Sequence, residues 1–123
     1  MTKFFKVLAA SLIAIFAVGS LSACASTAPM DMGKYAAVID VRTPEEWATG
    51  HLDGAVNINI EGADFAAQVE ALDHAANYVI YCRSGNRAGQ AIKYMQGAGF
   101  TGELMNAGAV NNASGMTGMK VVQ

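Results

Sequence analysis

The chain has 123 residues, which is enough for one domain of ordinary size but not for two. Its first 23 residues carry Lys3 and Lys6 and no acidic residue, so the remainder holds 6 basic and 10 acidic residues, a balance of −4. Because no stripe of Lys and Arg is available to follow a phosphate backbone, the composition argues against a nucleic acid partner.

The first residues have the layout of an export signal. Lys3 and Lys6 precede an apolar run over residues 7–18, and small residues follow as far as Cys24. This order is typical of a secretory signal peptide, and a run of 12 residues is shorter than the about 20 that span a bilayer, so an uncleaved membrane helix is the weaker alternative. We therefore predict three parts: a signal peptide over residues 1–23, a tether over 24–32 and one domain over 33–123.

Cys24 stands at the expected cleavage point. Residues 21–24, with the sequence LSAC, resemble a bacterial lipobox, in which the cysteine is acylated and becomes the first residue of the mature protein. An ordinary signal peptidase site is the alternative, because Ala23 and Ala25 also fit the small-x-small pattern. Lipidation at Cys24 predicts a periplasmic protein held on a membrane, with the outer membrane favoured because Ala25 rather than Asp follows the cysteine. Without lipidation we expect a soluble periplasmic protein.

The first predicted elements of the domain are a strand and a short helix. Residues 36–41 are apolar and β-branched and end in polar residues, as in a buried parallel strand. Thr43 and Glu46 form a capping box, which predicts a helix that starts there and ends at Gly50. Trp47 is interpreted as the residue that anchors this helix in the core.

Two further strands and a helix follow. After a turn at residues 51–54, residues 55–60 alternate apolar and polar side chains with the period of a strand. Asp64 is predicted to cap a helix whose apolar face is formed by Phe65, Val69 and Leu72. Residues 78–81 are too short and too apolar to be anything but a central strand.

The last predicted element is a helix over residues 88–98. From Asn106 onward the chain is rich in Gly, Asn and Met without a clear period, which predicts a loop with a short or frayed helical end. The Met residues are interpreted as packing residues rather than as copper ligands. Strands and helices thus alternate, which predicts an α/β fold with a parallel sheet covered by helices on both faces and ligand loops at the carboxyl ends of its strands.

Cys82 stands at the end of one such strand. It is the one cysteine of the predicted domain, and an unpaired cysteine in an exported protein is either buried and inert or kept for its chemistry. Gly85 can take positive φ and turn the backbone amides of the loop toward the sulfur, and the following helix adds the partial positive charge of its N-terminus. Arg83 and Arg87 add fixed positive charges that favour a thiolate and attract an anionic sulfur donor.

Two motifs resemble those of rhodanese domains. The sequence DVRTPEEW over residues 40–47, with GHLDGAVNI over 50–58, resembles the first rhodanese signature, and YCRSGNRA over 81–88 resembles the active-site loop. The resemblance covers about residues 33–110. It is strongest to the small exported single-domain rhodaneses, which are thiosulfate sulfurtransferases, and it implies a parallel sheet of about five strands with flanking helices.

The resemblance also implies the reaction and the roles of residues. Cys82 would take sulfane sulfur from a donor such as thiosulfate and pass it to a thiophilic acceptor such as a thiol or cyanide. Asp40 and Arg42 resemble the structural pair of the family near the site. The residues expected to bind substrate are Arg83, Ser84, Gly85, Asn86, Arg87 and Ala88. No cofactor or metal is implied, His51 and His74 are expected to be structural, and a monomer is expected.

Two other functions are weighed against sulfur transfer. Phosphatases that share this fold place five residues between Cys and Arg, whereas four lie between Cys82 and Arg87, so the loop fits a single sulfur atom better than a phosphate. A binding or redox-sensing module with the same fold usually lacks the cysteine or the loop charges, and both are present here. The sequence departs from many rhodaneses at Ala109 and Met116, where a second Gly and a Trp are common, and this leaves the acceptor surface open.

Overall fold

The computed structural model describes residues 30–123. The predicted signal peptide and the lipidation site at Cys24 lie outside the described residues. Within residues 30–123, no helix combines the length and the apolar character needed to cross a membrane.

A parallel sheet forms the centre of the fold. Its strands are β1 (Ala37–Asp40), β3 (Val56–Asn57), β4 (Tyr78–Cys82) and β5 (Leu104–Ala109), in the order β3-β1-β4-β5, and every neighbouring pair is parallel. All five residues of β4 are buried, which confirms the prediction of a central strand. The α/β fold is confirmed as well, although this sheet has four strands within the described residues rather than about five.

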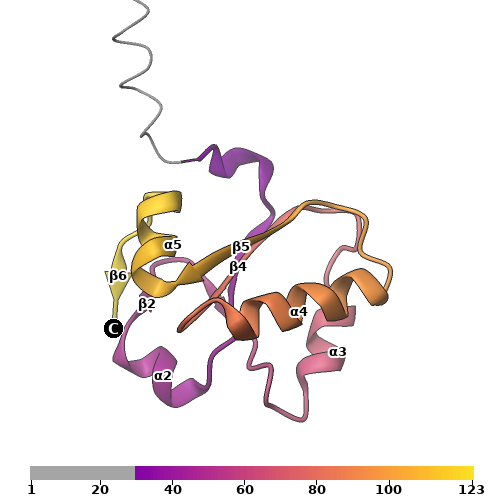
Figure 1. Ribbon diagram of the computed structural model, residues 1–123, viewed down its shortest axis with the longest axis horizontal. Helices are drawn as coiled ribbons and strands as arrows, with labels where there is room; N and C mark the ends of the chain where they lie inside the picture. Colours follow the sequence, from indigo (N-terminus) through magenta and orange to yellow (C-terminus); the bar gives the residue numbers. More distant parts are fainter. Residues whose placement is uncertain (1–29) are drawn as a thin grey trace, which may run out of the picture.

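Helices cover both faces of this sheet, as predicted. On one face α3 (Phe65–Glu70) and α4 (Asn86–Gly97) pack over a core that includes Ile39, Ile80 and Cys82. On the other face α5 (Val110–Thr117) and the short 3₁₀ helix η2 (Met32–Lys34) pack over a second core around Val79 and Tyr81. Figure 1 shows α3 and α4 next to each other and α5 well apart from them. Successive side chains of β4 point to opposite faces of the sheet and therefore contribute to two separate cores.

The helix α2 (Pro44–Thr49) has the predicted ends but not the predicted packing. Both hydrogen bonds of the capping box between Thr43 and Glu46 are present, and the helix ends at Gly50. The prediction that Trp47 enters the core is wrong, because no residue of α2 is buried. Its indole instead stacks on the His51 ring, with centroids 3.5 Å apart, and His51 Nδ1 lies 2.9 Å from the Trp47 carbonyl oxygen.

The segment after Val56 is less regular than predicted. Strand β3 has only two residues, although the amides of Ile58 and Ile60 still donate to the carbonyls of Asp40 and Val41. The Asn59 side chain accepts a hydrogen bond from the Glu61 amide and so bends the chain away from the sheet. Asp64 precedes α3 but makes no capping hydrogen bond with its side chain, so its predicted role as a cap is wrong.

The carboxyl-terminal segment has more regular structure than the predicted loop, although the short helix predicted there is present as α5. Strand β5 completes the sheet, α5 buries Ala113 and Thr117, and β6 (Val121–Val122) pairs antiparallel with β2 (His51–Leu52). The composition did not indicate these elements because β5 lies at the edge of the sheet, where Asn and Gly are tolerated, and because the residues that α5 buries are small. The methionines of this segment, Met105, Met116 and Met119, pack against the second core.

Candidate active site

Cys82 is the last residue of β4 and precedes the loop that leads into α4. The side chain is completely buried and belongs to the core beneath α3 and α4. Gly85 has a φ of 95°, a conformation that glycine adopts without steric cost, and its backbone amide donates to Cys82 Sγ over 2.8 Å. A left-handed glycine thus turns one peptide N–H onto the sulfur, directly before the positive end of a twelve-residue helix.

The other predicted residues of the loop differ in exposure. Arg83, Ser84 and Asn86 are exposed, Arg87 is partly buried, and Ala88 is buried beside the cysteine. The Asn86 amide donates to Ser84 Oγ at 3.4 Å, and within residues 30–123 no backbone amide besides that of Gly85 donates to the sulfur. The fuller ring of amides expected around a transferred sulfur therefore stays a prediction for the persulfide form.

Arg87 does not point freely into solvent, because it forms a two-pronged ion pair with Glu46 of α2. Its Nη1 and Nη2 atoms donate to the two carboxylate oxygens of Glu46 at 2.7 and 2.9 Å, and Glu61 Oε2 lies 3.9 Å from Nη1. The pKa of Arg87 is raised, mainly by the hydrogen bond to Glu46 and to a smaller extent by the negative charges of Glu46 and Glu61. Sequence reasoning placed Glu46 only in the capping box, since nothing in the sequence indicates a contact between residues 41 positions apart.

The ion pair between Glu46 and Arg87 predicts a loss of stability in acid. The hydrogen bond from Arg87 is the main reason that the pKa of Glu46 falls from 4.5 to about 2. A lowered pKa in the folded state stabilises the fold above pH 4.5, and this contribution is lost as the pH falls from there toward about 2. Because the two side chains are 21% and 26% exposed, solvent reduces the contribution to on the order of 1 kcal/mol.

Urea unfolding between pH 6 and pH 2.5 measures this effect. The wild-type protein is expected to lose more stability than Glu46→Gln over that range, because glutamine cannot titrate but can still accept the capping hydrogen bond. Parallel pH profiles for the two proteins would show that the ion pair contributes nothing to stability.

Asp40 and Arg42 form a buried ion pair at the end of β1. Arg42 Nη2 lies 2.7 Å from Asp40 Oδ2 and 2.6 Å from the Gly50 carbonyl oxygen, and the Arg42 amide donates to Asp40 Oδ1 at 2.9 Å. Burial lowers the pKa of Arg42, but the hydrogen bond to Asp40 and the nearby negative charges together outweigh it, so the net direction is upward. The guanidinium also lies 5.8 Å from the centre of the ring of Tyr81, the residue that directly precedes Cys82. The pair thus joins the end of β1 to Gly50 at the end of α2, close to the Tyr81 ring of β4.

Asn106 is a further residue of the site that sequence reasoning did not identify. Its Nδ2 atom donates to the Gly85 carbonyl at 3.0 Å, while its Oδ1 atom accepts from the Gly108 amide at 2.9 Å. The pairing of β4 with β5 is irregular at this point, and a Cβ atom on Gly85 would lie 3.3 Å from Gly108 Cα. Asn106 therefore holds the glycine whose amide contacts the sulfur, and we assign it as a positioning residue.

Asn106→Ala is expected to slow the reactions of the Cys82 thiol about 10-fold, which corresponds to one lost hydrogen bond of about 1.4 kcal/mol. Asn77→Ala is the matched control, because Asn77 also donates to a carbonyl, that of Lys34, and accepts from an amide, that of Glu103. It does so beside the first residue of β4, at the other end of the strand from Cys82. Steady-state kinetics and urea unfolding should show a similar stability for both variants but a slower reaction only for Asn106→Ala. Equal rates would mean that Asn106 has a structural role alone.

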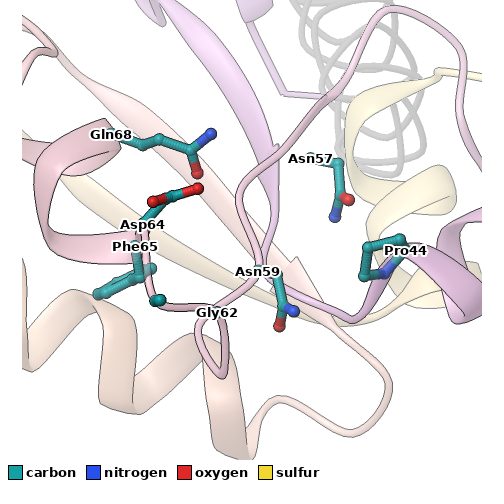
Figure 2. A pocket seen from close by; sticks show the side chains of 8 residues that line it. Pro44, Asn57, Asn59, Gly62, Asp64, Phe65 and Gln68 are labelled. Atoms are coloured by element: carbon teal, nitrogen blue, oxygen red, sulfur yellow. The ribbon is translucent and has the colours of Figure 1, made fainter.

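A pocket of about 230 Å³ lies on the β3 side of the sheet (Figure 2). Pro44 borders it on one side and the start of α3, with Asp64 and Gln68, on the other. Cys82 does not line it. The Asn57 side chain at its edge already donates to the carbonyls of Asp40 and Arg42. In this structure the pocket is therefore separate from the Cys82 sulfur.

The two histidines lie in structural positions. His51 stacks on Trp47, and His74 stacks on Phe100 with ring centroids 4.2 Å apart. Within residues 30–123, no three His, Cys, Asp or Glu side chains gather in a way that could hold a metal ion.

The sequence and the fold both match known proteins. The family model described as a rhodanese-like domain matches residues 26–114. The thiosulfate sulfurtransferase PspE of Escherichia coli K12 is 31% identical over 74 residues, which cover 60% of this chain and 70% of PspE. The thiosulfate:glutathione sulfurtransferase of Homo sapiens is 34% identical over 86 residues, which cover 60% of this chain and 75% of the human protein. MoeZ of Mycobacterium tuberculosis H37Rv is 32% identical, but the chain spans only 21% of its length.

Solved structures show the same fold. A rhodanese from E. coli, determined with anions, has a TM-score of 0.58 and 29% identity, over 71% of this chain and 96% of that one. A protein from Lactobacillus plantarum also has a TM-score of 0.58 and 29% identity, over 75% of this chain and 76% of that one. Given the parallel sheet, the cysteine loop at the end of β4 and these matches, the chain belongs to the family of rhodanese-like domains.

Proposed function

We propose that the protein is a sulfurtransferase that carries a sulfane sulfur on Cys82, with thiosulfate as a donor. One observation carries the proposal: the amide of Gly85 donates to the sulfur of Cys82 at the start of α4. A peptide N–H and a helix N-terminus both stabilise negative charge on sulfur. A persulfide needs the same stabilisation. The relatives named as thiosulfate sulfurtransferases support this donor.

The transfer takes place in two steps. The Cys82 thiolate attacks the outer sulfur of thiosulfate, a new S–S bond forms, and sulfite leaves with the electron pair of the broken bond. A thiol or cyanide then takes the outer sulfur, and the thiolate returns. The human relative named as a thiosulfate:glutathione sulfurtransferase supports a thiol acceptor. Because Cys82 is completely buried, the exposed side chains of Arg83, Ser84 and Asn86 have to move aside for the donor.

The burial of Cys82 also supports a second candidate, a binding or redox-sensing module in which the thiol does not react with sulfur donors. One experiment separates the two functions. The protein is incubated with thiosulfate, and the peptide that contains Cys82 is analysed by mass spectrometry. A mass increase of one sulfur atom, reversed by cyanide with formation of thiocyanate, supports the sulfurtransferase. No added sulfur and no thiocyanate would favour the module.

We further propose that the protein is exported, acylated at Cys24 and held on the periplasmic side of a membrane, with the outer membrane favoured. The order of charged, apolar and small residues before Cys24 supports this location. Expression of the full chain in a bacterium fed with a labelled fatty acid tests it. Label is expected on the wild-type protein in the membrane fraction and absent from Cys24→Ser. Unlabelled wild-type protein in the soluble periplasmic fraction would contradict the lipid anchor.

A further inference from the structure

The charge of Arg87 is compensated before any donor arrives. Both of its terminal nitrogens are bound to the carboxylate of Glu46, and the carboxylate of Glu61 lies 3.9 Å from one of them. A two-pronged pair of this kind is among the stronger hydrogen-bonded ion pairs in proteins. The guanidinium of Arg87, at the start of α4, therefore offers a donor anion much less attraction than a free arginine would.

Glu46 is held in this position from its own helix. Its Oε1 atom lies 3.4 Å from the backbone nitrogen of Thr43 and 3.2 Å from the Thr43 hydroxyl oxygen, at the N-terminus of α2. A swing of the carboxylate away from Arg87 would break the capping box as well as the ion pair. Glu46 thus stays beside the loop as a fixed negative charge.

The remaining charges around the loop do not outweigh this carboxylate. Arg42 is buried and paired with Asp40, so its charge is also compensated. Arg83 is exposed and has no salt bridge within residues 30–123. On the acidic side stand Glu46 and Glu61, whose carboxylates both lie against the Arg87 guanidinium. A donor with two negative charges therefore meets little net attraction and one close carboxylate.

We propose that Glu46 is a specificity-determining residue that makes the site favour sulfane donors with a single negative charge over those with two. This inference rests on the proposed sulfur transfer through Cys82. The favoured class is that of thiosulfonates, in which an organic group replaces one charged oxygen of thiosulfate. The reaction has the same balance, because the Cys82 thiolate takes the outer sulfur and a sulfinate leaves with the bonding electrons in place of sulfite.

Thiosulfate and methanethiosulfonate provide the test, since both present the same reacting sulfur and differ by one charge. Single-turnover persulfide formation on Cys82 gives kcat/KM for each donor in the wild-type protein, in Glu46→Gln and in Glu45→Gln. In Glu46→Gln the preference is expected to shift toward thiosulfate by about 10-fold, the size of one partly screened charge interaction. Glu45→Gln is the control, because it removes the same charge from the same helix without a salt bridge to Arg87 among the described residues. It should leave the preference unchanged.

The other outcomes overturn the inference in different ways. An unchanged donor preference in Glu46→Gln, or an equal loss with both donors, would mean that Glu46 supports the loop without selecting a donor. If neither donor forms a persulfide in the wild-type protein, the proposed function itself fails and the inference fails with it. If Glu46→Gln does not fold, the test is the salt dependence of persulfide formation from the two donors in the wild-type protein. Added salt should raise the reactivity of thiosulfate relative to methanethiosulfonate, whereas a relative fall would show net attraction of the dianion and overturn the inference.

Discussion

Cys82→Ser is expected to lower sulfur transfer by at least about 10³-fold while the protein remains folded. The hydroxyl can still accept the hydrogen bond that the Gly85 amide now gives to the sulfur at 2.8 Å, so the loop keeps its anchor. It cannot carry sulfur, because a serine hydroxyl forms no persulfide. The loss is measured as the rate of sulfur transfer from thiosulfate to cyanide, monitored through the thiocyanate that forms.

The same substitution is expected to have a modest cost in stability. Cys82 is completely buried in the core formed with α3 and α4, so a hydroxyl replaces a less polar thiol in apolar surroundings. The cost should be about 1–2 kcal/mol, or roughly 5–10 °C in the thermal midpoint. Cys82→Ala provides the comparison, because it removes the sulfur and introduces no polar group. Transfer activity retained in either variant would exclude Cys82 as the sulfur carrier, and collapse of both would make the thiol a structural residue.

The parts of the fold that the sequence predicts well are those with a local cause. The capping box of Thr43 and Glu46 is complete within four residues, and both of its hydrogen bonds are present in α2. The four apolar residues from Tyr78 to Tyr81 could be covered only by burial on both faces, and β4 lies between β1 and β5 with every residue buried. Alternation of such strands with helices is sufficient to predict the parallel sheet.

Features that depend on distant segments could not be predicted in this way. Trp47 is large and apolar, but its helix lies outside both cores, and the His51 ring four residues later provides the surface on which it stacks. The pairing of β2 with β6 joins segments that the sequence gives no reason to place together. The same holds for the two contacts that hold the cysteine loop, from Glu46 to Arg87 and from Asn106 to Gly85. The nucleophile could therefore be proposed from a sequence motif, but the residues that position its loop could be identified only from the folded structure.

Gly102→Ala is expected to be the most destabilising of the glycine substitutions, for a reason of space rather than of backbone conformation. Gly102 precedes β5 and does not have positive φ, unlike Gly85. A Cβ atom at this position would overlap the backbone carbonyl of Ala76. Because the obstacle is main chain and not a flexible side chain, the expected loss is about 3 kcal/mol, at the upper end of the range for overpacking.

The segment that contains Ala76 cannot easily move away. The Thr101 amide donates to the His74 carbonyl at 2.8 Å, and the Glu103 amide donates to the Asn77 side chain at 2.7 Å. A shift large enough to admit the new methyl group would break the hydrogen bonds on either side of Gly102, and with them the start of the β4–β5 pairing. The substitution is therefore expected to destabilise the sheet that holds Cys82 and not only the surface turn at Gly102.

Gly97→Ala is the matched control in the same chain. Gly97 is the last residue of α4, and apart from its chain neighbours and the backbone of its own helix no atom lies within 4 Å of the position its Cβ would take. Alanine is preferred over glycine in a helix, so this variant should gain up to about 0.5–1 kcal/mol. Urea unfolding of both variants measures the difference. If Gly102→Ala were as stable as the wild-type protein, the chains around residues 76 and 102 could not lie as close together as they do here, and the alignment of β4 with β5 at that end would be wrong.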